Sequence, residues 1–376
     1  MAQSKGIILV SAGGTGGHLF PAEALSHELA RRGWAVHLAT DHRAQKYADN
    51  FPAEKTHVIE AASPSGKNPF KMLAAAFALY KGIRTSKVLL ERLKPQAVVG
   101  FGGYPTVPPL VAASNDYPTM IHEQNAVAGR ANKLLAGRVT AIAGGFLKAQ
   151  GEHSDKIVET GNPVRPPVLA AADIAYKPPA KSGKINLVIF GGSQGANFFS
   201  TEFADGLALL PAPIRQRLHV TQQARPEDRE SALAKYRDMG VEAEVSPFFT
   251  DLAERIGKAH LVVARSGAST VSEVSVIGRP SILVPYPHAL DHDQAANAEA
   301  LAEAGGALVR KQGDMSAQSI AEELESLLSD SAALKKMAQA AKAAGRPDAA
   351  ILLADLTEAI ASGQSVAAFK AATNTA

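Results

Sequence analysis

Short runs of apolar, often β-branched residues alternate with longer segments of helical periodicity along most of the 376-residue chain. This alternation is typical of βα units, in which helices connect the strands of a parallel sheet. The pattern predicts two sets of strands, one in each half of the chain. They are Lys5–Ser11, Trp34–Thr40, Thr56–Glu60, Ala97–Val99, Thr119–His122 and Val139–Ala143, then Asn186–Phe190, Leu218–Thr221, Glu244–Ser246, Leu261–Ala264, Ser281–Val284 and Ala307–Val309.

The segment Gly161–Pro167 predicts a boundary between two domains, because its three prolines oppose continuation of a helix or a strand. We expect two doubly wound, Rossmann-like α/β domains, over residues 1–162 and 163–345. A helix over residues 346–361 is expected to return to the N-terminal domain. The small, polar residues 362–376 predict a disordered tail.

Two predicted strands lead directly into glycine-rich loops. Residues 12–18 read Ala-Gly-Gly-Thr-Gly-Gly-His, residues 191–196 read Gly-Gly-Ser-Gln-Gly-Ala, and a helical pattern follows each loop. Glycine allows a tight turn and a close approach of the backbone to a ligand, and the helix N-terminus behind it favours a phosphate group. One such loop can be a simple turn. Two at matching positions predict two similar domains that face each other across a ligand cleft.

Other polar clusters also follow predicted strands, at the sheet edge where doubly wound folds bind ligands. They are His122–Asn125, Arg265–Glu273 and Tyr286–Gln294. Each could be an ordinary surface loop, but their common position favours a site. The Asp and His residues of Tyr286–Gln294 have no strong metal-ligand spacing, so we expect neither a metal nor a cofactor. His18, at a helix N-terminus, is expected to be a neutral base because the helix dipole lowers its pKa.

Composition narrows the possible partners. The absence of cysteine excludes disulfides and thiolate chemistry, and the start of the chain lacks the features of a signal peptide. Residues 1–162 hold 18 Lys and Arg against 12 Asp and Glu, whereas residues 163–376 hold 21 against 24. The basic N-terminal half indicates an anionic partner. No block of basic and aromatic residues indicates nucleic-acid binding.

The segment Phe70–Lys94 predicts a long helix with six basic residues and one acidic residue. One apolar stripe would suffice for packing, but a second stripe is rimmed by basic side chains. The second stripe predicts an interfacial helix on anionic lipid, with Phe77, Tyr80, Lys81 and Arg84 in contact with the membrane. The alternative is a helix buried on two sides with solvated lysines.

Taken together, these motifs resemble one family. The motifs occur in the order found in that family. They are Gly13–His18 with Pro21-Ala22, His122–Asn125, Gly161–Arg165, Gly191–Gly195, Arg265–Glu273 and Asp293–Asn297. The chain is similar to the MurG family of bacterial lipid II synthases over about residues 5–360. The resemblance implies a GT-B fold and transfer of N-acetylglucosamine from its UDP donor to the C4 hydroxyl of lipid I, with inversion. Lipid I carries its muramoyl-pentapeptide on undecaprenyl diphosphate. A peripheral protein on the cytoplasmic face of the inner membrane is implied as well.

The resemblance also implies roles for individual residues. His18 is the candidate base and Glu123 the second candidate. Glu273 would bind the ribose hydroxyls and Gln294 the sugar hydroxyls, while Asp293 replaces a glutamine common in the family, so its role stays open. The implied contacts to UDP-N-acetylglucosamine are Thr15, Gly16, Gly17, Asn125, Arg165, Ser193, Phe249, Arg265, Ala268, Ser269, Thr270, Val271, Ser272, Glu273 and Gln294.

Two alternatives stay open on the sequence. The first is another enzyme of the same fold, such as a UDP-N-acetylglucosamine 2-epimerase, which would release a soluble product. The second is a two-domain binder of small molecules, which would normally carry an export signal.

Overall fold

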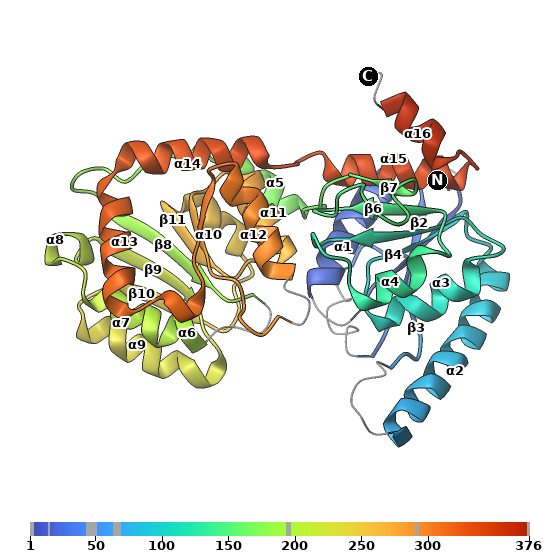
Figure 1. Cartoon of the computed structure of the whole chain (residues 1–376), viewed down its shortest axis with the longest axis horizontal. Helices are drawn as coiled ribbons and strands as arrows, with labels where there is room; N and C mark the ends of the chain where they lie inside the picture. Colours follow the sequence, from blue (N-terminus) through green and yellow to red (C-terminus); the bar gives the residue numbers. More distant parts are fainter. Residues whose placement is uncertain are drawn as a thin grey trace. The chain divides into compact units, whose positions relative to one another are not determined.

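A computed structural model describes residues 4–13, 16–42, 51–62, 69–192, 197–289 and 293–373. The chain divides into two compact units (Figure 1). The first comprises Met1–Arg165 and Pro347–Ala376, and the second comprises Pro166–Arg346. Each unit is built on one parallel sheet with helices on both faces, which confirms the predicted α/β, doubly wound class.

The sheet of the first unit has seven parallel strands in the order β3-β2-β1-β4-β5-β6-β7. The strands are β1 Ile7–Ser11, β2 Ala35–Thr40, β3 Lys55–Val58, β4 Ala97–Gly100, β5 Thr119–Glu123, β6 Ala141–Gly144 and β7 Ile157–Val158. The helices are α1 Gly16–Arg31, α2 Pro69–Leu93, η2 Tyr104–Thr106, α3 Val107–Ala113, α4 Arg130–Ala136, α15 Ala349–Ala361 and α16 Val366–Thr373.

Strand β1 explains why both faces of this sheet are covered. Its residues are almost continuously apolar, as expected of a parallel strand buried on two sides. Ile8 and Val10 belong to a core shared with α1 and α15, whereas Leu9 belongs to a second core with α2, α3 and α4. The sequence predicted the strands of this sheet except the two-residue β7, which is too short to carry a periodic signal.

The sheet of the second unit has six parallel strands in the order β10-β9-β8-β11-β12-β13. The strands are β8 Ile185–Phe190, β9 Leu218–Gln223, β10 Glu242–Ser246, β11 Leu261–Ala264, β12 Ser281–Leu283 and β13 Ala307–Val309. The helices are α5 Pro166–Ala172, α6 Asn197–Ser200, α7 Glu202–Ala208, α8 Ala212–Arg215, η3 Pro226–Asp228, α9 Arg229–Asp238, α10 Leu252–Lys258, α11 Ala268–Ile277, α12 Asp293–Glu303, η4 Gln312–Asp314, α13 Ala317–Ser329 and α14 Ser331–Ala344.

Strand order reverses beside the first strand of each sheet. β1 lies between β2 and β4, and β8 lies between β9 and β11. In doubly wound sheets the ligand crevice lies outside the carboxyl ends of the strands at such a switch point. The glycine-rich loops follow β1 and β8, and so begin at these positions.

The last residues of the chain complete the first unit. Helix α15 packs on α1, and Arg32, the residue after α1, donates to Asp355 and Glu358 at 2.6 Å each. The disordered tail predicted for residues 362–376 is wrong over α16. Val366 and Phe369 are buried in the core of the first unit. Two apolar residues one helical turn apart are enough to pack this short helix on the core. Because small and polar residues surround them, the sequence shows no clear helical pattern of apolar positions.

Candidate active site

The residues predicted to form the site divide between the carboxyl edges of the two sheets. In the first unit they follow β1 and β5, and in the second they follow β10, β11 and β12. Thr15 and Ser193, expected to contact the donor, lie outside the described residues.

His18, in the first turn of α1, packs against the loop that follows β4. A Cβ atom at Gly102 would lie 3.2 Å from both Cε1 and Nδ1 of the imidazole, and one at Gly103 would lie 3.3 Å from Cδ2. Both glycines also have positive φ, of 89° and 76°. Any other residue would be strained and would crowd the ring. This glycine pair therefore forms the pocket of His18, a role that the sequence did not reveal.

His18 has a lowered pKa, and the cause is burial. The charge of Glu123 and contacts with Gln124 and the Phe101 carbonyl raise the pKa, but by less. Burial thus favours the neutral imidazole, in the same direction as the helix dipole expected from the sequence. Nδ1 is buried and has no hydrogen-bond partner among the described residues. The neutral form of the imidazole is the form that can accept a proton.

Glu123, the second candidate base, is 2% exposed at the end of β5. Its Oε1 accepts from the backbone N–H and Nδ2 of Asn125, at 3.1 and 3.2 Å. Its Oε2 accepts from the Gly129 N–H and from Asn132 Nδ2, both at 2.8 Å. Both oxygens hold the following loop in place, so accepting a substrate proton would compete with these four bonds. The carboxylate is better placed to stabilise a charged His18.

His122 and Gln124, on either side of Glu123 in the sequence, hold the end of β5 in place. His122 is fully buried, and its Nε2–H donates to the Gly161 carbonyl at 3.1 Å. Burial lowers the pKa of His122 to about 4, so this imidazole is neutral at pH 7. Gln124 donates through Nε2 to the Phe101 carbonyl at 2.8 Å, which ties the end of β5 to the end of β4.

Arg165, the last residue before the second unit, is held over the first turns of α1. Its guanidinium centre lies 3.7 Å from the centroid of the Phe20 ring. Gly16 lies beneath the same ring, since a Cβ there would be 3.0 Å from Phe20. Gly17 is exposed beside it. Of the donor contacts implied for the first unit, the structure thus gathers Gly16, Gly17 and Arg165 around the start of α1.

In the second unit, α11 begins directly after β11 and presents its N-terminus at the sheet edge. The N-cap is Gly267, which has no side chain to cap the helix, and a Cβ there would meet nothing within 4 Å. The first-turn N–H groups lack intrahelical acceptors, which suits a phosphate. The first turns of α11 contain the other implied donor contacts, which are Ala268, Ser269, Thr270, Val271, Ser272 and Glu273. Ala268, Val271 and Ser272 are buried, and Glu273, one turn along the helix, is 9% exposed.

The guanidinium of Arg265 forms hydrogen bonds with other residues of the second unit. Its Nη1 donates to the carbonyls of Val284 and Pro285 at 3.1 and 3.2 Å, and its Nη2 donates to Gln312 Oε1 at 2.6 Å. The side chain is 6% exposed, and burial lowers its pKa to about 10, which still leaves it charged at pH 7. Arg265 therefore fixes the loop after β12. Its partner Gln312, which lies 47 positions away, carries no motif that could have identified it.

Gln294 and Asp293 open helix α12. The Tyr286 N–H donates to Gln294 Oε1 at 3.0 Å, and Ser266 Oγ donates to the Gln294 carbonyl at 2.7 Å. These bonds hold the start of α12 beside the loops after β11 and β12. Asp293 is partly buried, and its carboxylate is favourably placed in the first turn of the helix.

Two phenylalanines follow β10. Phe249 is 8% exposed and lies under the Arg255 guanidinium, 4.5 Å from its ring centroid. Phe248 is 65% exposed. The sequence indicated Phe249 but not Phe248, whose exposure after the end of β10 is visible only in the structure.

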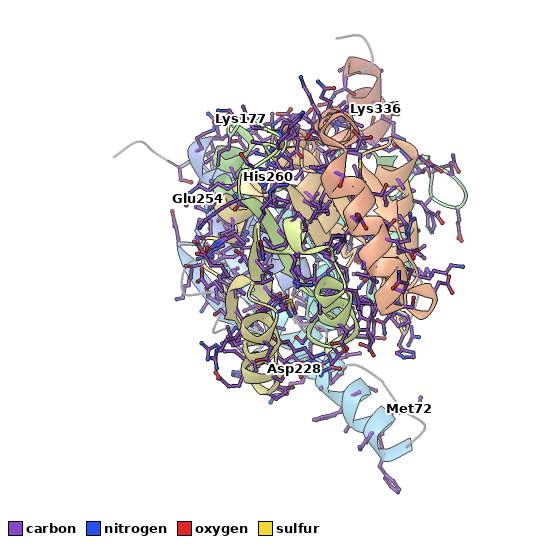
Figure 2. The ribbon with its side chains drawn as sticks, turned by 90° about the vertical axis from the view of Figure 1, so that its left-hand side faces the viewer. Met72, Lys177, Asp228, Glu254, His260 and Lys336 are labelled. Atoms are coloured by element: carbon purple, nitrogen blue, oxygen red, sulfur yellow. The ribbon has the colours of Figure 1, made fainter. Side chains whose placement is uncertain are left out.

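Helix α2 carries the predicted membrane face. Phe70, Leu73, Phe77 and Tyr80 are 82%, 71%, 67% and 56% exposed, so the alternative of a helix buried on two sides is wrong for this segment. The first turns of α2 project from the rest of the first unit (Figure 1 and Figure 2). Met72, which is labelled in Figure 2, lies in these turns.

The predicted basic rim of this face is partly paired. Lys81 Nζ lies 2.7 Å from Glu60 Oε1, and Arg84 Nη1 donates to the Tyr80 hydroxyl at 3.3 Å. Among the described residues, no helix is long and apolar enough to cross a bilayer. The same part of the chain holds no cluster of three or more His, Asp or Glu residues arranged for a metal ion.

Comparison with known proteins gives consistent matches. The sequence matches the glycosyltransferase family 28 N-terminal domain over residues 8–144 and the family 28 C-terminal domain over residues 186–353. Relatives from Agrobacterium fabrum and Rhizobium meliloti are each 59% identical, over 98% and 97% of this chain and 98% of their own length. Both are named UDP-N-acetylglucosamine–N-acetylmuramyl-(pentapeptide) pyrophosphoryl-undecaprenol N-acetylglucosamine transferase.

Solved structures agree with this match. The crystal structure of Acinetobacter baumannii MurG aligns with a TM-score of 0.74 at 29% identity, over 94% of this chain and 99% of that one. A UDP-N-acetylglucosamine 2-epimerase aligns with a TM-score of 0.62 at 14% identity, over 93% of this chain and 94% of that one, and so shares the fold alone.

Proposed function

The chain belongs to glycosyltransferase family 28, and from this we infer that it is a UDP-sugar hexosyltransferase that makes lipid II. It transfers N-acetylglucosamine from UDP-N-acetylglucosamine to the muramoyl sugar of lipid I, which is linked to undecaprenyl diphosphate. The observation that carries this conclusion is the 59% identity with transferases so named, over nearly the full length of both chains.

We propose that His18 is the general base. The neutral imidazole takes the proton of the C4 hydroxyl, and the oxygen attacks the anomeric carbon as the bond to the diphosphate oxygen breaks. UDP leaves with the bonding electrons, and the anomeric centre inverts. Glu123 stabilises the imidazolium that forms. The proposal is supported by the lowered pKa of His18 and by the four hydrogen bonds that occupy Glu123.

We propose that the second unit binds the UDP-N-acetylglucosamine donor. The first turn of α11 and Ser193 would hold the diphosphate, with Arg165 adding positive charge. Glu273 would accept the ribose hydroxyls. Phe249 would line the uracil site, and the exposed Phe248 would stack on the base. Gln294 would bind the transferred sugar, with Asn125, Gly16 and Gly17 contributing from the first unit.

We further propose that the protein binds reversibly to the anionic, cytoplasmic face of the inner membrane through α2. The acceptor is lipid-linked, so an enzyme with no membrane-spanning helix in its described residues must dock where the acceptor lies. The exposed stripe from Phe70 to Tyr80 would enter the interface, with basic residues nearby.

Incubation with radiolabelled UDP-N-acetylglucosamine and a lipid I analogue tests the enzymatic function. The label should move to the lipid fraction only when the acceptor is present. Conversion of the donor to a soluble epimer without an acceptor would instead indicate a 2-epimerase.

A further inference from the structure

A continuous chain of hydrogen bonds links η4 to the start of α12. Gln312 of η4 accepts from Arg265 Nη2 at 2.6 Å, and Arg265 Nη1 donates to the carbonyls of Val284 and Pro285. The next residue, Tyr286, donates its N–H to Gln294 Oε1 at 3.0 Å. The position of the Gln294 side chain thus depends, through Arg265, on a residue of a different element.

Little packing supports η4 on one side. A cavity of about 370 Å³ lies between β13, η4 and α13, and Lys311, Asp314 and Met315 are among its lining residues. An ion pair between Arg310 and Glu323 lies on the same wall. Among the described residues, the bond to Arg265 is the one side-chain hydrogen bond of Gln312. The chain on either side of η4 is held by the bond from the Arg310 N–H to the Leu283 carbonyl and by Met315, which packs on the core.

Arg265 in turn depends on Gln312. Its guanidinium is buried against the rings of Phe199 and Tyr286, 5.3 and 5.5 Å from their centroids. Its Nε has no hydrogen-bond partner among the described residues. Loss of the Gln312 acceptor would leave Nη2, as well as Nε, without a hydrogen-bond acceptor among the described residues, which is costly for a charged group. The guanidinium would then turn toward another acceptor and release the loop after β12.

We propose that Gln312 is a positioning residue for the donor sugar. It acts through Arg265 on the loop Val284–Tyr286, which holds the side chain of Gln294. The proposal rests on the proposed function, in which Gln294 binds the transferred sugar while α11 binds the diphosphate. It follows that Gln312 influences recognition of the sugar more than recognition of the nucleotide.

The test measures the affinity of Gln312 variants for UDP-N-acetylglucosamine and for UDP by calorimetric titration. In Gln312→Leu we expect the Kd for UDP-N-acetylglucosamine to rise about three- to tenfold, and the Kd for UDP to change by less than about twofold. The KM for the donor should rise with its Kd. Gln312→Glu keeps an acceptor for Arg265 and should restore most of the affinity for the sugar nucleotide.

The matched control is Gln318→Leu. Gln318 bonds only to Glu322 on the exposed face of α13 among its described contacts, and neither Kd should change. Equal weakening of both ligands in Gln312→Leu, with a lowered melting temperature, would mean a merely structural role and overturn the inference. Unchanged affinities would overturn it as well. Failure of the unmodified enzyme to bind either ligand would instead contradict the proposed function.

Discussion

At the scale of single residues, His18 gives the sharpest prediction. His18→Ala should lower kcat by about 10²–10⁴-fold and leave donor affinity nearly unchanged. The base must be neutral, and burial lowers its pKa below 6.5, so the wild-type rate should fall only as the pH drops below that value. This acidic limb should vanish in His18→Ala.

Glu123→Gln separates the two candidate bases. The Glu123 charge raises the pKa of His18, so its removal should move the acidic limb to lower pH while a reduced rate remains. Loss of the limb in Glu123→Gln, with the limb retained in His18→Ala, would make Glu123 the base.

Glu273→Ala should weaken UDP-N-acetylglucosamine binding by about 1–3 kcal/mol, because charge-assisted hydrogen bonds to the ribose are lost. A 2′,3′-dideoxyribose donor provides the matched ligand. The wild type should lose a similar free energy with this donor, and Glu273→Ala should lose little more. Additive losses would place the carboxylate away from the ribose.

Residue types at strand ends could be predicted from the sequence, but their partners could not. His18 and Glu273 stand in motifs that mark loops and helix starts. The pocket of His18 depends on Gly102 and Gly103, which come from another loop, and Arg265 depends on Gln312. Such contacts arise from tertiary packing, so no local pattern announces them.

At the scale of elements, α2 is predicted to govern membrane binding. Leu73→Ser/Phe77→Ser removes two exposed apolar side chains and should reduce co-sedimentation with anionic vesicles about tenfold or more. Turnover of a short-chain, soluble acceptor should be retained, and turnover of acceptor in vesicles should be lost. Leu209→Ser is the control, because Leu209 is also an exposed leucine, at 54%, and belongs to the second unit. Unchanged sedimentation of the double variant would exclude α2 as the docking element.

Docking of α15 is predicted to depend on pH through Glu358. Burial opposes its ionisation, but hydrogen bonds from Trp34, Arg32 and Lys5 lower its pKa to about 2. The resulting stability is fully present above the unfolded pKa, near 4.5, and is lost as the pH falls toward 2. Glu358→Gln should cost about 1 kcal/mol at pH 7, since the group is partly exposed.

Thermal unfolding of wild type and Glu358→Gln between pH 7 and pH 3 measures this effect. The difference in melting temperature should shrink below pH 4.5. Glu254→Gln, at an exposed pair with Lys258 (Glu254 is labelled in Figure 2), should change little. A difference independent of pH would contradict the role of the Glu358 charge.

Long, strongly apolar elements were predictable. The twelve expected strands all occur, with shifts of a residue or two at their ends, because buried parallel strands are continuous apolar runs. β7, η4 and α16 were not predicted, since each is short and is held by contacts that its own sequence does not encode.

At the scale of the whole molecule, turnover should persist in EDTA. In the proposed mechanism the charge of the leaving UDP is stabilised by the N–H groups of α11 and by Arg165, so no step requires a metal. The measurement is the initial rate with and without chelator. Full loss of activity, restored by Mg²⁺ or Mn²⁺, would show that these groups are insufficient.

The core of the first unit contains residues from both ends of the chain. Leu353, Leu356 and Phe369 pack with Ile8 and Val10, although the whole second unit separates them in sequence. On the ribosome, Pro166–Arg346 is therefore synthesised before α15 and α16 can pack on the face of the first sheet that contains Ile8 and Val10. We expect the second unit to fold first. Until α15 and α16 leave the ribosome, the apolar surface of β1 and α1 that these helices cover stays exposed. In the cell, that interval is when the nascent chain most needs a chaperone.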